Sequence, residues 1–266
     1  GEDPGFWELV GGRTVPPADV PAALGDVSLD DYVGYEGQGE FLRVVATPEP
    51  GVRKLERDPA THLIVAEAYK ELPQGYTVHR WGRGPANAIA LTFDDGPDPV
   101  YTERILDTLK TYHVPAAFFV IGSSALDNPA TVKRIFEEGH EIGSHTYWHA
   151  NLSMTPDLLI RLGLNATQRA IVATTGRKTV LFRAPYGEDV EPMTADEVRP
   201  LNVLSDLGYI AVGMQVDPED WRKPGVDAIV SSVMEQARRR EGNVIVMHDA
   251  GGDRSETLAA LPRIIE

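Results

Sequence analysis

Residues 88–97 read Ala-Ile-Ala-Leu-Thr-Phe-Asp-Asp-Gly-Pro, an apolar run that ends in two aspartates and a turn. A short apolar run bounded by turn residues is typical of a strand that is buried on both faces. We therefore predict a buried strand over Ala88–Phe93, with Asp94 and Asp95 at its carboxyl end.

Apolar runs alternate with amphipathic stretches from this strand to the end of the chain. Further strands are predicted at Ala116–Val120, around Ile142, and at Val180–Phe182, Tyr209–Val216 and Asn243–Met247. Helices are predicted at Tyr101–Tyr112, Pro129–Glu138, Thr155–Thr175, after Thr194 with Glu197 at capping-box spacing, and at Gly225–Arg240 and Glu256–Ile265. This alternation predicts roughly six parallel βαβ units, arranged either as a doubly wound sheet or as a small (β/α) barrel.

Polar clusters come directly after most of the predicted strands. They are Asp94–Pro97, His145 with His149, Arg183–Gly187, Asp217–Trp221, and His248 with Asp249. The carboxyl ends of parallel strands meet on one face, which is where barrel enzymes have their active sites. This recurrence favours the barrel and predicts a site on that face.

Residues 1–84 differ from the rest of the chain. They are rich in Pro, Gly and acidic residues, contain short apolar runs, and carry no catalytic motif. We predict an irregular extension of unknown role over residues 1–84, with a few strands and a helix near Ala60–Leu72. The catalytic domain is predicted over residues 85–266.

The composition excludes several classes of function. The 40 acidic side chains against 25 basic ones give a formal charge of −15 without a basic stripe, which argues against a nucleic-acid partner. The chain has no cysteine, so disulfides, thiolate nucleophiles and cysteine-based zinc sites are excluded. No apolar run reaches membrane-spanning length, and no signal peptide opens the sequence.

Asp94 and Asp95 are adjacent carboxylates at a strand end. Successive strand side chains point in opposite directions, so one aspartate can bind a metal while the other faces a reacting water. Asp-Gly-Pro is also a good turn sequence, and a simple turn is the alternative interpretation.

His145 and His149 are four residues apart. On a helical turn this spacing places both imidazoles on one face, within reach of one ion. With one aspartate they would form a set of two histidines and one carboxylate, which leaves coordination positions open for water and substrate. Two surface histidines at a helix start are the alternative. His62, His79, His113 and His140 lack partners at ligand spacing, and we expect them to be structural or exposed.

The other clusters suggest an acid and a base. Arg183, in the stiff turn that leads to Pro185, would orient a carboxylate base and keep it ionised, or it would cap a helix. A carboxylate at Asp220 would raise the pKa of His248, so that this histidine acts as a general acid, although a core histidine is the alternative. Trp221 would line an apolar pocket or pack in the core.

Five motifs of the chain resemble those of the polysaccharide deacetylases, the NodB-homology group or carbohydrate esterase family 4. They are Thr92–Pro97, His145–His149, Arg183–Tyr186, Asp217–Trp221 and Val246–His248, in the order of the family. The resemblance covers roughly residues 86–266 and implies a distorted (β/α) barrel with about seven or eight strands.

The resemblance also implies a role for each motif residue. Asp94 would be the general base, Asp95, His145 and His149 would hold one divalent metal, usually Zn²⁺, and Arg183 would orient Asp94. Asp220 would tune His248, the general acid. Tyr186, after Pro185, would lend its backbone N–H to an oxyanion, and Trp221 would line the acetyl pocket. The family often has Leu where this chain has Val246, which implies a slightly wider acetyl pocket.

The implied function is metal-dependent removal of N-acetyl groups from N-acetylglucosamine-containing oligo- or polysaccharides, such as chitin, peptidoglycan or exopolysaccharide. An O-acetyl esterase, an amidase for a non-sugar amide and a non-catalytic carbohydrate-binding module stay open as alternatives. The family implies an extracellular or cell-envelope location. The stretch His248–Arg254 resembles members fused to a membrane glycosyltransferase, which implies a longer, membrane-associated parent, and family members normally continue into a last strand beyond the equivalent of Glu266.

Overall fold

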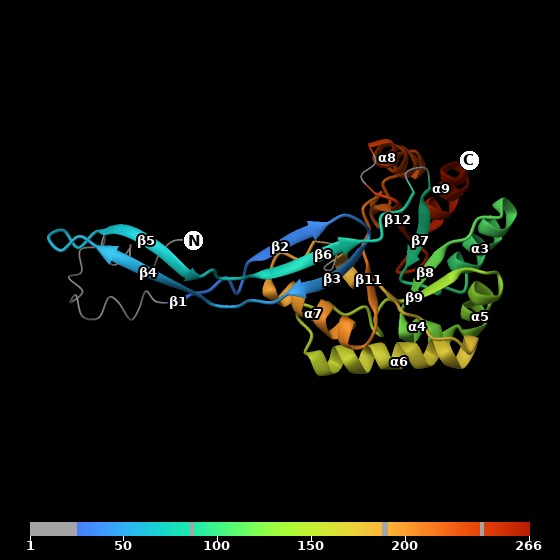
Figure 1. The fold of residues 1–266 in the computed structure, drawn as a ribbon. Coiled ribbons are helices and arrows are strands. Elements are labelled where there is room, and N and C mark those ends of the chain that lie inside the picture. The colour runs from blue at the N-terminus through green and yellow to red at the C-terminus, as the bar shows by residue number, and fades with distance from the viewer. Residues whose placement is uncertain (1–25, 86–87, 188–190, 240–241) are drawn as a thin grey trace. The chain divides into compact units, whose positions relative to one another are not determined.

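Strands and helices alternate from β7 onward, as the sequence pattern predicts (Figure 1). The computed structural model describes residues 26–85, 88–187, 191–239 and 242–266. The strands of this part are β7 (Ala90–Asp94), β8 (Ala117–Val120), β9 (Glu141–Ser144), β10 (Leu181–Phe182), β11 (Ile210–Val212) and β12 (Val244–His248). The helices are α3 (Tyr101–Tyr112), α4 (Gly122–Asp127), α5 (Pro129–Glu137), α6 (Asp157–Thr175), α7 (Ala195–Asp206), α8 (Val226–Arg239) and α9 (Ser255–Ile265), with short 3₁₀ turns η1 (Pro185–Gly187) and η2 (Asp220–Arg222).

The parallel strands form a distorted barrel. Their order is β12-β7-β8-β9-β10-β11, and the antiparallel strand β3 (Phe41–Ala46) follows beside β11. Val216 closes the ring, because it donates its N–H to Val244 O (3.2 Å) and accepts the N–H of Val246 (3.0 Å). The helices contact one another in the order α8, α9, α3, α5, α6, α7 around the strands. The predicted α/β barrel is thereby confirmed, with six parallel strands among the described residues.

Apolar side chains of the strands and of the inward helix faces make up the core. Phe93 of β7 and Phe118 of β8 stack with ring centroids 5.1 Å apart. In α3 the buried face includes Ile105, Leu106 and Leu109, a spacing that places them on one side of a helix. The strands therefore pack against the helices through one apolar core, which supports the polar strand ends.

Two helix starts test the capping predictions. Thr194 caps α7 as predicted: its hydroxyl accepts the N–H of Glu197 (3.4 Å), and the Glu197 carboxylate accepts the N–H of Thr194 (3.1 Å). The prediction that Thr155 caps α6 was wrong. The Thr155 hydroxyl donates to Asn151 O (2.5 Å) in the preceding loop, and Pro156 takes the cap position instead.

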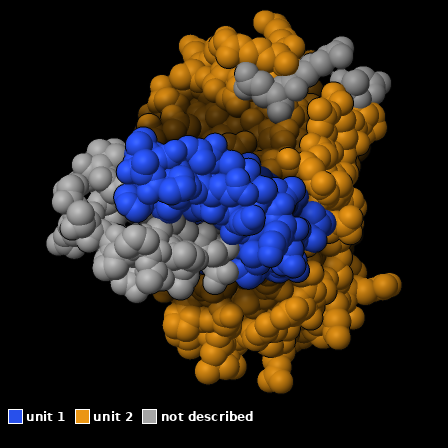
Figure 2. Space-filling model, turned by 60° about the vertical axis from the view of Figure 1, so that its left-hand side comes forward, with its two compact units in different colours: residues 1–34, 45–77 blue, residues 35–44, 78–266 orange. Residues whose placement is uncertain are grey.

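The structure divides the chain into two compact units, which Figure 2 colours separately. The first consists of residues 1–34 and 45–77, and the second of residues 35–44 and 78–266. This division differs from the predicted boundary at residue 84, because residues 35–44 and 78–84 belong to the barrel unit. Residues 1–25 of the predicted extension lie outside the described part of the chain.

The described part of the front segment is made of strands. They are β1 (Asp26–Val27), β2 (Val33–Gly37), β3, β4 (Gly51–Arg57), β5 (Ile64–Glu71) and β6 (Tyr76–Trp81). The predicted helix near Ala60–Leu72 was wrong. Asp58 turns the chain by accepting the N–H groups of Ala60 (2.9 Å) and Thr61 (2.8 Å), and β5 then pairs with β4 in an antiparallel hairpin. Pairing with β4 outweighs the helix preference of the alanine and glutamate residues.

No helix within the described residues is long and apolar enough to cross a membrane.

His140 links the starts of two strands and makes the stability of the barrel dependent on pH. Its Nδ1 accepts the N–H of Ala116 (3.1 Å), and burial lowers the pKa of the imidazole. The unfolded chain therefore binds a proton first as the pH falls, and the free energy of unfolding should decrease below about pH 6.5. Chemical unfolding at about pH 7.5 and about pH 5 measures this loss. The free energy of unfolding of His140→Gln should decrease less between these two pH values. An equal decrease in both proteins would show that His140 is not its cause.

Candidate active site

A cavity of about 390 Å³ opens at the carboxyl ends of the parallel strands. Its walls come from the ends of β7, β9, β10, β11 and β12, the positions that the sequence pattern predicts. The lining residues are Asp94, Asp95, His145, His149, Ala184, Tyr186, Gly187, Met214, Asp217, Trp221, His248 and Arg254.

Asp94, the last residue of β7, is held by a buried arginine. Nη1 of Arg183 donates to Oδ1 of Asp94 (2.8 Å) and to the Thr92 hydroxyl (2.7 Å). Nε donates to the carbonyl oxygen of Val212 (3.3 Å), and Nη2 donates to the carbonyl oxygen of Gly213 (3.1 Å). A guanidinium that is itself held by several acceptors fixes the orientation of the carboxylate beside it.

Asp95, His145 and His149 form one cluster, in which one ligand atom from each residue lies within 4.8 Å of the others. Nε2 of His149 is 3.1 Å and Nε2 of His145 is 3.5 Å from Oδ1 of Asp95. Burial disfavours the charge on Asp95, but the two imidazoles outweigh this effect and lower the pKa of its carboxyl. The cluster therefore offers two nitrogens and one carboxylate oxygen.

This cluster fits a divalent metal ion. Nδ1 of His145 donates to the carbonyl oxygen of Arg183 (2.8 Å), since a carbonyl can only accept, and Nε2 keeps its lone pair for a ligand bond. Oδ1 of Asp95 is buried and accepts no hydrogen bond within the described part of the chain. A buried carboxylate oxygen without a donor is costly unless a cation lies beside it. Two histidines and one carboxylate are a donor set of catalytic zinc with an open position.

The two histidines lie on a loop, so the predicted helical turn was wrong. The described backbone from His145 to Ala150 is not helical, and Thr146 (φ 65°) and His149 (φ 59°) adopt left-handed conformations. These two reversals bring both imidazoles to Asp95, which itself has a φ of 78°. The four-residue spacing pointed to His145 and His149 by way of a helical turn, whereas a loop with left-handed residues brings them together.

His248, the last residue of β12, pairs with Asp220. Its Nδ1 is 2.7 Å from Oδ1 of Asp220, and its backbone N–H donates to Oδ2 (2.9 Å), which also accepts the hydroxyl of Thr257 (2.6 Å). Burial opposes the protonated imidazole, but Asp220 outweighs it and raises the pKa of His248 to about 9. Nδ1 is occupied, so Nε2 is the nitrogen that faces the cavity, and it carries a proton at neutral pH.

Of the four residues predicted to bind substrate, two line the cavity and two do not. Tyr186 and Trp221 are exposed and line the cavity, and the Tyr186 and His149 rings meet in a T-shaped contact with their centroids 4.7 Å apart. Pro185 and Val246 are buried and are not among the lining residues. Met214, which the sequence did not point to, lines the cavity where an apolar wall was predicted.

A buried aspartate that the sequence did not assign holds the turn after Asp95. Oδ1 of Asp249 accepts the N–H of Gly96 (3.0 Å), and Oδ2 accepts the Thr102 hydroxyl (2.6 Å). Burial raises the pKa of Asp249 to about 7, with Asp95 and Asp94 adding to the rise. A Cβ at Gly96 would lie 2.3 Å from Oδ2 of Asp249, so only glycine allows this approach. Its position after His248 at a strand end was the one signal in the sequence.

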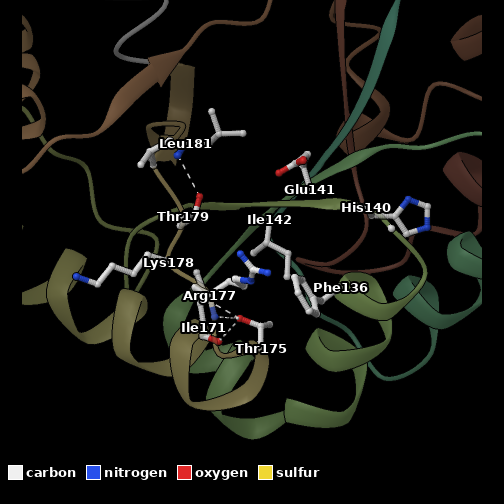
Figure 3. Close-up of a pocket in the computed structure, with 12 residues that line it drawn as sticks. Phe136, His140, Glu141, Ile142, Ile171, Thr175, Arg177, Lys178, Thr179 and Leu181 are labelled. Carbon is white, nitrogen blue, oxygen red and sulfur yellow. Dashed lines mark hydrogen bonds between the residues drawn. The ribbon is translucent and has the colours of Figure 1, made fainter.

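A second cavity of about 300 Å³ lies at the opposite ends of β9 and β10 (Figure 3). Ile142 and Ile171 are buried beside it, whereas Arg177 and Lys178 are exposed. None of the predicted site residues lines it. The chemistry-bearing residues of the described chain therefore gather at the carboxyl ends of the strands.

Asp94 and His248 are partners in the register of the adjacent strands β7 and β12. A carboxylate that Arg183 holds in one orientation and an imidazole that Asp220 keeps protonated thus face one cavity, beside the cluster of Asp95, His145 and His149. This combination can take a proton from an attacking water and give one to a leaving group, which is the requirement of acyl hydrolysis.

Comparisons with known proteins agree with this chemistry. A profile of the family described as polysaccharide deacetylase matches residues 82–212. The chain is 40% identical to a chitooligosaccharide deacetylase of Sinorhizobium fredii over 207 residues, which cover 74% of this chain and 92% of that protein. It is 39% identical over 203 residues to a peptidoglycan-N-acetylglucosamine deacetylase of Bacillus cereus, covering 74% and 88%.

The fold is also found among solved structures. The Bc1960 peptidoglycan N-acetylglucosamine deacetylase superposes with a TM-score of 0.62 at 36% identity. The match covers 68% of this chain and 82% of that one.

The cluster should bind zinc through all three side chains. His145→Ala removes one ligand, so we expect zinc affinity to fall by more than the roughly 10- to 100-fold typical of losing an outer hydrogen-bond partner. Isothermal titration calorimetry of the zinc-free protein with zinc measures this affinity. His113→Ala, which lies outside the cluster, is the control and should bind zinc as the parent does. Unchanged affinity in His145→Ala would exclude the cluster as the zinc site.

Proposed function

Since this chain belongs to the polysaccharide deacetylase family, we propose that it hydrolyses the acetamide of N-acetylglucosamine units in an oligo- or polysaccharide. Membership of this family confirms the resemblance that the five motifs indicated and makes the chain a hydrolase. The observation that carries the proposal is the pairing of Arg183 with Asp94 and of Asp220 with His248 at one cavity, next to the three-residue cluster.

The names of the relatives suggest the substrate. One relative is named for chitooligosaccharides and the other for peptidoglycan N-acetylglucosamine, so both substrates share an acetylated glucosamine unit. We propose this unit as the group recognised here. The peptidoglycan relative supports an extracellular or cell-envelope location, and the longer, membrane-associated parent stays a prediction.

Asp94 acts as the general base of the proposed reaction. Arg183 binds Oδ1 and holds the carboxylate in one orientation, so that Oδ2 accepts a proton from the water that attacks the acetyl carbon. Asp95, His145 and His149 would hold the divalent ion, for which we propose zinc. When bound, the ion would polarise the acetyl carbonyl and lower the pKa of the attacking water.

His248 acts as the general acid. An amide anion is a very poor leaving group, so the departing nitrogen needs a proton as the bond to carbon breaks. Asp220 keeps His248 protonated at neutral pH, and Nε2 donates that proton. The backbone N–H of Tyr186, in a left-handed turn (φ 63°) at the cavity, is proposed to donate to the oxyanion, and Trp221 to contact the acetyl methyl group.

Acetate release tests the proposed function. N-acetylglucosamine oligomers of increasing length and peptidoglycan fragments are incubated with protein from which metal has been removed, and then with zinc restored. We expect release only with zinc, and more release from longer oligomers. Release from an acetyl ester or from a non-sugar amide alone would support the esterase or the amidase instead. A protein that binds oligomers without turnover with any metal would be a binding module.

Asp94→Asn should lower kcat by at least ~100-fold, as expected when a general base is lost. The amide cannot take the proton of the attacking water, whereas the three proposed metal ligands are unchanged. Acetate release measures the rate, and titration with zinc shows whether the ion still binds. Full activity in this variant would remove Asp94 from the mechanism.

The pH profile should depend on the Asp220–His248 pair. Activity is expected to fall as the pH rises through about 9, because His248 loses the proton that it donates. Asp220→Asn removes the charge that raises this pKa, so the fall should move to lower pH. Initial rates of acetate release, measured from about pH 6 to about pH 10, show where activity falls. If activity fell at the same pH in the parent and in Asp220→Asn, the Asp220–His248 pair would not be the cause of the fall.

A further inference from the structure

Glu40 is a buried carboxylate in front of β3, outside the residues 82–212 that the family profile matches. It is 4% exposed and belongs to the barrel unit. Its carboxylate accepts the N–H of Asn243 (2.8 Å), and its carbonyl oxygen accepts the N–H of Gly213 (2.6 Å). A carboxylate is buried at a cost, so its position calls for a physical reason.

The reason lies in the way the barrel closes. The chain pairs with β10 through β11 and with β12 through Val216, so residues 213–215 cross between the two. We call this crossing, together with Asn243 directly before β12, the seam of the barrel. Glu40 provides acceptors to the backbone N–H groups on both sides of the seam. A backbone N–H that is buried without an acceptor is strongly disfavoured, so the seam depends on this residue.

The seam is built for a close approach of Glu40. A Cβ at Gly242 would lie 2.9 Å from Oε1 of Glu40 and 2.2 Å from Cβ of Gln215. A Cβ at Gly213 would lie 3.1 Å from the carbonyl oxygen of Glu40. Two glycines therefore leave the space that Glu40 occupies.

The seam also carries the hydrogen bonds that place the base. The carbonyl oxygens of Val212 and Gly213 accept from Arg183, and Arg183 donates to Asp94. The backbone carbonyl of Glu40 holds the N–H of the same Gly213 whose carbonyl holds the guanidinium, and the Glu40 carboxylate anchors that backbone through its bond to Asn243. A shift of Gly213 would therefore move Arg183 away from Asp94, although Glu40 touches neither substrate nor base.

We propose that Glu40 is a positioning residue for the proposed deacetylation, which acts by closing the barrel seam and thereby holding Arg183 against Asp94. The proposal rests on the proposed function. It predicts that residues 35–44 are required by the catalytic unit, although they come before the family match. It also predicts that Glu40 affects turnover more than substrate or metal binding.

Three variants of the whole chain test this. In Glu40→Ala the acceptor for Asn243 is lost, and we expect kcat to fall by about 10- to 100-fold while KM and zinc affinity stay within about twofold of the parent. Glu40→Gln keeps an oxygen acceptor and should retain kcat within about threefold. Glu36→Ala, an exposed glutamate of the same segment that pairs with His79, is the matched control and should behave as the parent.

Amide hydrogen exchange gives a readout that does not depend on activity. Asn243 should lose protection in Glu40→Ala because its acceptor is the carboxylate, and Gly213 should lose part of its protection because the carbonyl of residue 40 is no longer anchored to Asn243. Both amides should keep their protection in Glu40→Gln. Should Glu40→Ala fail to fold, Glu40→Asp replaces it, because it keeps the charge but is one methylene too short to reach Asn243, and the same losses are expected. A folded Glu40→Ala or Glu40→Asp with parental kcat and parental protection would overturn the proposal. A parent protein without acetate release contradicts the proposed function instead, and the exchange data still decide whether Glu40 closes the seam.

Discussion

Arg183 is the buried charge on which the site depends. Its guanidinium is fully buried, lies 4.2 Å from the centre of the Phe119 ring, and donates to Asp94, to Thr92 and to two carbonyl oxygens. Burying an unpaired guanidinium costs several kcal/mol, at least ~3, so the surrounding acceptors cannot move without a large penalty. Its own carbonyl accepts from His145, so one residue sets both the orientation of the base and the tautomer of a metal-ligand histidine.

The loops around the cavity carry backbone strain that the barrel supports. Asp95, Thr146, His149 and Tyr186 all have positive φ angles between 59° and 78°. Each such residue costs on the order of 1 kcal/mol or more, and it persists only where the surrounding packing over-determines the conformation. The rigid layers of β7 to β12 provide that packing. Regular strands position the ends of the loops, and strained turns aim the side chains.

Much of this site was predictable from residue order. The strand before Asp94, the helix at Tyr101–Tyr112 and the polar clusters at strand ends follow from hydrophobic period and turn residues, which are local properties. The helix predicted near Ala60–Leu72 failed because the segment pairs with the preceding strand β4, and this pairing outweighs the helix preference of the segment itself. Val246 does not line the cavity because its side chain is buried, whereas Met214 is among the lining residues.

The sequence by itself determined the family, the parallel α/β plan and the identity of the groups that can carry acid, base and metal chemistry. These depend on residue type and on spacing within single motifs. Tertiary structure alone decided that a loop brings His145 and His149 to Asp95, that Asp249 accepts a hydrogen bond from the turn after Asp95, and that Glu40 bonds across the seam. Each of these needs a hydrogen bond or a convergence across many residues, and the sequence holds no local period that marks such distant pairs.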